Sequence, residues 1–171
     1  MMNSDIQTGD IVLVKDYPNP QHMKAGTPAT KDRFAVVIGN FKEGFSATPA
    51  QAIATKSGRT ERPGYRTFAN EIRLPKGITN SRRDFELKGV ILAHRFPMID
   101  QKQMVYKAGR LPLETRLNMI EVHEHIKDMP FYNEMKQENK NYAKFMGFFK
   151  DVTIAEKLQF MRDEQGNHHY E

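Results

Sequence analysis

The sequence predicts a mainly β fold whose strands occupy the first two thirds of the chain and whose helices come last. Residues 34–38 are five consecutive apolar side chains, mostly β-branched or aromatic, that end at Gly39. Such a run is typical of a central strand covered on both faces. After residue 111, apolar side chains recur at helical spacing instead. The predicted class is therefore α+β, with a small β domain and a helical tail.

Composition restricts the kind of protein this chain can be. Its 171 residues, 39% of them apolar, are enough for one domain with a real core, or for one domain and an appendage. The chain has no cysteine, which excludes disulfides, thiolate metal sites and cysteine nucleophiles and favours a reducing compartment. No run of apolar residues is as long as the apolar core of a signal peptide or a membrane span. We therefore expect a cytoplasmic protein.

The basic residues are not spread evenly. Lys and Arg number 26 against 21 Asp and Glu, which gives a net charge of +5 and a pI near 9.4. Residues 127–171 hold seven of the basic and eight of the acidic residues, so residues 1–126 carry +6. This excess suits a polyanionic partner, although an ordinary charge excess explains it equally well.

The first strands flank a long loop. Residues 11–14 follow a Gly-Asp turn and read as a short buried strand. Residues 16–32 hold three prolines, which cannot donate to a strand ladder, so we expect a loop there. Loops of this length inside a domain are usually functional or mobile. This one carries His22 and Lys31, which are either binding residues or solvated loop charges.

Further elements follow in order. We expect strands at residues 51–54, 65–74 and 87–93, an extended piece at 98–100, and a turn into the next element at 106–110. A helix is predicted for residues 112–127. The tail predicts two more helices, 131–149 and 153–165, with Thr153 and Glu156 as a capping box at the start of the second. Residues 166–171 are expected to be frayed, with His168 and His169 solvated rather than metal-bound.

Three stretches carry a family resemblance. They are Gly9-Asp10-Ile11 with its strand, Arg33 with the strand after it, and a last stretch that contains Ile99-Asp100-Gln101-Lys102 and Gly109-Arg110-Leu111. In this order and spacing, over roughly residues 8–126, the chain resembles the PemK/MazF family of toxin endoribonucleases.

The resemblance implies a fold, an activity and partners. The fold would be a small SH3-like barrel of PemK/MazF/CcdB type at residues 1–127, with a C-terminal helix, followed by a helical extension at 128–171 that short family members lack. The activity would be cleavage of single-stranded RNA without a metal ion or other cofactor. The partners would be a second copy in a homodimer and an antitoxin whose acidic tail occupies the RNA groove.

Three residues fall at positions that the family uses in catalysis. Arg33 falls on the arginine at the strand entrance, and Thr55 falls on a threonine near the scissile phosphate. His94 falls where many members carry an acid. His is suited to proton transfer near neutral pH, and Arg stabilises charge developing on phosphoryl oxygens. We therefore expect Arg33 as stabiliser and possible proton donor, His94 as acid or base, and Thr55 as positioning group.

Further polar residues are candidates for binding RNA. His22, together with the Gly26-Thr27 pair that follows it, is similar to a loop motif of the family. Residues 55–59 form a polar turn at a strand end, a plausible phosphate cradle. The candidate RNA-binding residues are His22, Lys31, Lys56, Ser57, Arg59 and Arg95.

Each catalytic candidate has a structural alternative. Arg33 would instead form an ion pair with Asp32 or another acid, His94 would bond to the backbone, and Thr55 would be a turn hydroxyl. Phe34 and Phe96 would stack on bases or pack in the core.

The chain also departs from the family pattern. Phe34 replaces the usual proline, His94 replaces the acid, and Leu92 stands where some members carry a second arginine. A second reading follows from these departures: a barrel that has lost catalysis and binds a protein or nucleic acid partner. In a third, the tail covers the protein's own groove.

Overall fold

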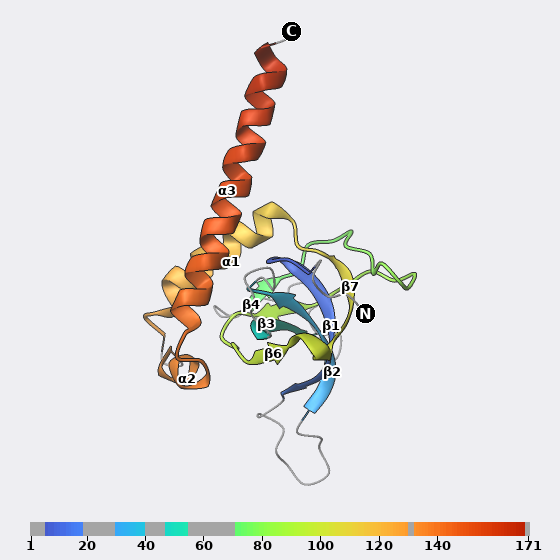
Figure 1. Cartoon of the computed structure of the whole chain (residues 1–171), viewed down its shortest axis with the longest axis vertical. Helices are drawn as coiled ribbons and strands as arrows, with labels where there is room; N and C mark the ends of the chain where they lie inside the picture. The colour runs from blue at the N-terminus through green and yellow to red at the C-terminus, as the bar shows by residue number, and fades with distance from the viewer. Residues whose placement is uncertain (1–5, 19–29, 40–46, 55–70, 130–131, 170–171) are drawn as a thin grey trace, which may run out of the picture.

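The computed structural model describes residues 6–18, 30–39, 47–54, 71–129 and 132–169 (Figure 1). Its strands form one antiparallel sheet in the order β4-β5-β3-β2-β1-β7, with β6 paired to β3. The mainly β class with helices at the end is confirmed. The strands are β1 (Asp10–Pro18), β2 (Thr30–Val37), β3 (Ala47–Ala54), β4 (Glu71–Arg73), β5 (Val90–Leu92), β6 (Met98–Asp100) and β7 (Met104–Arg110).

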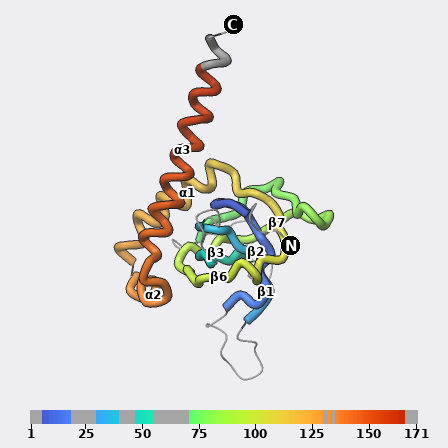
Figure 2. Tube along the Cα trace, in the orientation of Figure 1, coloured from blue at the N-terminus to red at the C-terminus, as the bar shows by residue number. Residues whose placement is uncertain are grey.

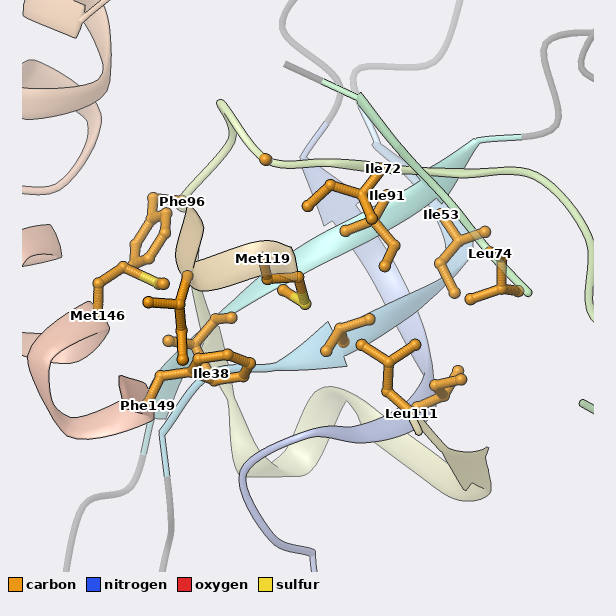
Figure 3. Packing of buried hydrophobic residues seen from close by; sticks show 14 of the residues in the cluster. Ile38, Ile53, Ile72, Leu74, Ile91, Phe96, Leu111, Met119, Met146 and Phe149 are labelled. Carbon is orange, nitrogen blue, oxygen red and sulfur yellow. The ribbon is translucent and has the colours of Figure 1, made fainter. Parts of the chain in front are cut away.

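Both faces of the central strands are buried, as predicted for residues 34–38. Neighbouring residues point to opposite faces of a strand. Val36 accordingly packs in the main core and Val37 in a second cluster on the other face. The main core lies between the sheet and the helices, where Ile38 and Phe149 come from distant parts of the chain (Figure 3).

The helices cover one side of the sheet. Helix α1 (Leu113–Ile126) agrees with the predicted 112–127, and α2 (Tyr132–Glu138) and α3 (Tyr142–His169) follow. Helix α3 packs beside α1 and then extends away from the rest of the protein (Figure 2). No helix in the described parts of the chain is both long and apolar enough to cross a membrane.

The predicted boundaries inside the tail are wrong. The break falls between α2 and α3, and α3 runs straight through residues 150–152. Thr153 is fully buried in the middle of α3, so it does not cap a helix. A capping pattern reports only local preference, whereas Phe149 and Thr153 pack against the rest of the protein and keep the helix continuous. Helix α3 contributes side chains to the main core. The division of the chain into two domains at residue 127 stays a prediction.

Glu156 fixes α3 at the point where it leaves the globule. Its carboxylate accepts from Arg116 Nη1 at 2.5 Å and Nη2 at 2.9 Å, and from Arg110 Nη2 at 3.2 Å. The hydrogen bonds from Arg116 lower the pKa of Glu156 to about 2. A bidentate Arg–carboxylate pair sets orientation as well as energy.

The strands at the two ends of the barrel differ from prediction. Strands β1 and β2 extend into the predicted loop 16–32, and a bulge after Val14 places Asp16 at φ 56. Residues 106–110 belong to strand β7 rather than a turn. Of the predicted strand 65–74, only β4 and its neighbours lie in the described part. Pattern alone misses such strands because their partners lie far away in sequence.

The Gly-Asp-Ile and Gly-Arg-Leu motifs meet in space. Arg110 Nη1 donates to Asp10 Oδ1 at 2.9 Å, and Leu111 N donates to Gly9 O at 2.9 Å. Asp10 is fully buried. An unpaired buried carboxylate would be costly, so these two motifs hold the ends of the barrel together.

A buried polar link joins α1 to β3. Gln51 Nε2 donates to Ala93 O at 3.1 Å and lies 3.2 Å from Nε2 of His123. Burial lowers the pKa of His123 to about 4. The folded protein therefore keeps this imidazole neutral at pH values where an exposed histidine is charged.

Replacement of Phe149 by Ala should lower the free energy of unfolding by about 3–5 kcal/mol, because it empties a fully buried aromatic site. Phe160→Ala is the matched control on the same helix. That side chain is 56% exposed, so its loss should change stability by no more than about 0.5 kcal/mol. Urea unfolding of both variants measures the difference. Equal effects would mean that α3 does not close the core.

The free energy of unfolding should fall as pH drops from 6.5 to about 4. In this range His123 is protonated in the unfolded chain and stays neutral in the folded protein. The slope should be about 1.4 kcal/mol per pH unit, or roughly 3 kcal/mol over the window. His123→Leu should remove this slope. The exposed His125→Leu, on the same helix, should keep it. Urea titrations at several pH values measure both, and an unchanged slope in His123→Leu would refute the assignment.

Candidate functional site

Arg33 lies on β2 opposite Val14 of β1 and is half-buried. Its position in the strand places it on the face of Ala35, the side of the second cluster. The carboxylate of Asp32, an alternative partner, accepts instead from the backbone N of Asp16 at 3.1 Å. Arg33 forms no ion pair with any residue in the described ranges. Its guanidinium is therefore not committed to a described carboxylate.

Tyr17 connects Arg33 to a second part of the sheet. Its hydroxyl donates to Ala50 O at 2.7 Å and accepts from Ala52 N at 3.2 Å. Burial raises the pKa of Tyr17, and the positive charges of Arg95 and Arg33 oppose that rise. Both charges therefore act on the same buried hydroxyl.

His94 lies in the turn between Leu92 and Arg95. The turn begins after β5 and is closed by a hydrogen bond from Arg95 N to Leu92 O at 3.2 Å. His94 is half-buried there. A histidine on a short turn between two strands is held by the sheet on both sides, which suits a group that must meet a substrate in fixed geometry.

Helix α2 holds this turn from outside the barrel. Arg95 is buried, and its Nε and Nη2 each lie 3.0 Å from Oε1 of Glu138. The other oxygen of Glu138 accepts from Phe96 N at 3.0 Å, and Asn139 Nδ2 donates to Phe96 O at 3.2 Å. The predicted tail therefore holds the two residues that follow His94. Arg95 is buried and paired with a carboxylate of the same chain. Both facts argue against the predicted contact between Arg95 and a phosphate.

The two phenylalanines pack rather than project. Phe96 is fully buried in the main core, with its ring edge-to-face to His123 at 5.7 Å and to Tyr142 at 5.8 Å. Phe34 is half-buried and lies edge-to-face to Phe85 at 6.2 Å. For Phe96 the core alternative is confirmed, and base stacking is excluded by its burial.

A buried carboxylate that the sequence pattern does not single out stands beside the site. Glu71 on β4 lies directly opposite Leu92 on β5 and is 5% exposed. Side chains of directly opposite residues share a face of the sheet. Glu71 therefore places an acid opposite the last residue of β5, two residues before His94 in the sequence. Its strand was predicted, but only the pairing with β5 reveals its neighbour.

The remaining candidates divide into two groups. Lys31 is exposed on β2, opposite Tyr17 and two residues before Arg33, and so on the same face of the strand. The others lie outside the described residues: His22, Thr55, Lys56, Ser57 and Arg59. Ala54, the residue before Thr55, is the last of β3 and pairs with Val90 of β5. The structure thus places Arg33 and Lys31 on the same face of β2.

The candidate site residues are hydrogen-bond donors and proton carriers. No group of three His, Asp or Glu side chains that could hold a metal ion occurs within the described residues. A guanidinium, an imidazole and a carboxylate are groups that can bind an oxyanion and move protons.

Comparison with known proteins supports the fold. No family model matches the sequence, and no curated protein does. Among solved structures, MazF from Deinococcus radiodurans shares 14% identity over 72% of this chain and 97% of its own, with a TM-score of 0.50. An endoribonuclease from a mycobacterial species shares 12% identity over 76% of this chain and 97% of its own, with a TM-score of 0.49. A MazE–MazF complex from Deinococcus radiodurans shares 13% identity over 72% of this chain and 96% of its own, with a TM-score of 0.49.

The chain has the fold of MazF-type toxin endoribonucleases. The predicted barrel of PemK/MazF type is confirmed in the antiparallel sheet and the C-terminal helices of Figure 1.

Glu138→Gln should destabilise the protein by about 2–3 kcal/mol, because it leaves the buried guanidinium of Arg95 without a counter-charge. Glu124→Gln is the matched control. Glu124 pairs with Lys150 at 3.6 Å on the surface, where such pairs contribute about 0–1 kcal/mol. Urea unfolding compares the two. The inference about the turn fails if Glu138→Gln costs no more than Glu124→Gln.

Proposed function

We propose that this protein is a toxin-type endoribonuclease that cleaves single-stranded RNA without a metal ion. One observation carries the proposal. On a MazF-type fold, Arg33 is half-buried on β2 and has no ion pair to a described residue. An uncompensated guanidinium on a strand suits the binding of a phosphate group.

The proposed reaction uses the 2′-hydroxyl of the RNA as nucleophile. A base removes its proton, the oxygen attacks the adjacent phosphorus, and an acid protonates the departing 5′-oxygen. The products are a 2′,3′-cyclic phosphate and a 5′-hydroxyl end. Arg33 stabilises the charge on the phosphoryl oxygens, His94 acts as acid or base, and Thr55 positions the phosphate or the 2′-hydroxyl. Glu71 is a further candidate for the proton transfers.

The same proposal assigns partners. Lys31 would contact the RNA backbone, together with His22, Lys56, Ser57 and Arg59. The +6 charge of residues 1–126 would attract RNA and an acidic antitoxin tail alike. We further propose a homodimer through the barrel, and a cytoplasmic location, where the RNA substrate is found.

A second candidate function is binding without catalysis. Two observations favour it. Arg95 forms an ion pair with Glu138 and so is not free to contact a phosphate, and Leu92 stands where some members of the family carry a second arginine. In that case the barrel would hold an RNA or protein without cleaving it.

Arg33→Ala should reduce the rate of RNA cleavage in EDTA by about 10²- to 10³-fold, since it removes the charge-stabilising donor. His94→Ala should reduce it by about 10²- to 10⁴-fold through loss of proton transfer. A mixed-sequence RNA assayed by gel, with end analysis for cyclic phosphate, measures both.

Arg162→Ala is the matched control, because it removes an exposed arginine on the extended part of α3. Its cleavage rate should equal that of the unmodified protein. Cleavage that survives both active-site substitutions would contradict the residue roles. An unmodified protein that binds RNA but does not cleave it would favour the second function.

A further inference from the structure

The end of α3 exposes apolar side chains that no part of the described chain covers. Glu156 makes the last ion pair between α3 and the globule, and every residue from 157 to 165 is exposed. This segment includes Leu158 at 47%, Phe160 at 56% and Met161 at 45% exposure. Figure 1 shows the helix projecting into solvent over this length. A projecting helix end of this size gains little stability on its own in water.

Three apolar residues form a seam on the outer side of the helix. Ile154, which is half-buried, and the exposed Leu158 and Met161 recur at the four- and three-residue spacing that repeats on one face of a helix. Leu158 follows Phe149 by nine residues, or two and a half turns, and therefore points away from the side that packs on the globule. A second helix can lie along this seam without displacing any contact that α3 already makes.

The charges beside the seam distinguish between partner orientations. Lys157 and Glu164 flank it on one side, seven residues apart, and Arg162 flanks it on the other. In a parallel pair of identical helices, Lys157 would face Arg162 of the other copy, which is repulsive. In an antiparallel pair with Leu158 against Met161, Lys157 would face Glu164 twice, which is attractive.

We propose that two copies of this protein associate through an antiparallel pair of their α3 helices. In this contact, Leu158 of each copy packs against Met161 of the other. Lys157 of each copy forms an ion pair with Glu164 of the other. This contact is separate from the barrel and independent of RNA cleavage. It places the two barrels at opposite ends of the helix pair.

Sedimentation equilibrium of the full chain tests the contact. Leu158→Asp should halve the average mass at concentrations where the unmodified protein is associated, because a charge replaces the centre of the seam. If the barrels also pair, each copy has two separate twofold contacts, so the unmodified protein forms larger assemblies that Leu158→Asp reduces to the barrel dimer. An unchanged mass in Leu158→Asp overturns the proposal.

Charge substitutions test the orientation. Glu164→Lys should weaken association about tenfold, because two attractive pairs become repulsive. The exchange Lys157→Glu with Glu164→Lys should restore it. Asp163→Lys makes the same charge change on the opposite side of the helix, where Asp163 bonds Gln159, and should have little effect. Equal effects of Glu164→Lys and Asp163→Lys, or no restoration in the exchange, overturn the antiparallel pairing.

A distance measurement gives an independent check. The chain has no cysteine, so Asp151→Cys introduces a single site for a spin label. Two labels should lie about 28 Å apart in the antiparallel pair, given the rise per residue and the spacing of packed helices. A separation of about 10 Å, the spacing of packed helices, would indicate a parallel pair and overturn the proposal.

Discussion

The central strands of this protein are buried on both faces, and most of the structure follows from that requirement. Along β2, alternate residues enter either the main core or the second cluster. A sheet with two apolar faces must be covered twice, because each uncovered face would expose its side chains to water. Helices α1 and α3 cover the first face, and Tyr17, Ile99 and Met104 close the other.

This requirement also explains why the C-terminal helices contribute to the main core. Phe149 of α3 is fully buried in the core that it shares with Ile38, the residue after β2. Glu138 of α2 pairs with Arg95, and the same carboxylate holds the backbone of Phe96. The extension thus stabilises the turn that presents His94. A change in the tail would therefore act on the turn that carries His94 through Arg95 and Phe96.

The arrangement of charge at the site differs from what alignment of single residues suggests. His94 stands where the sequence resemblance places an acid, and a buried carboxylate, Glu71, lies across the ladder from Leu92. Arg95, next in sequence to His94, is used for structure, whereas Arg33 is not paired with a described residue. Whether a basic residue is committed to the fold depends on which carboxylate reaches it, and sequence proximity does not decide that.

The sequence by itself determined the class of fold, the central strand at residues 34–38 and helix α1, because each depends on a local apolar period. It also singled out Arg33 and His94, although their roles stay predictions. The tertiary structure alone decided the continuity of α3, since the local capping signal of Thr153 loses to the burial of that residue. It alone decided the lengths of β1 and β7, the pairing of Asp10 with Arg110, and the commitment of Arg95 to Glu138. These features join residues far apart in the chain, and their energies come from burial and charge pairing that no local pattern records.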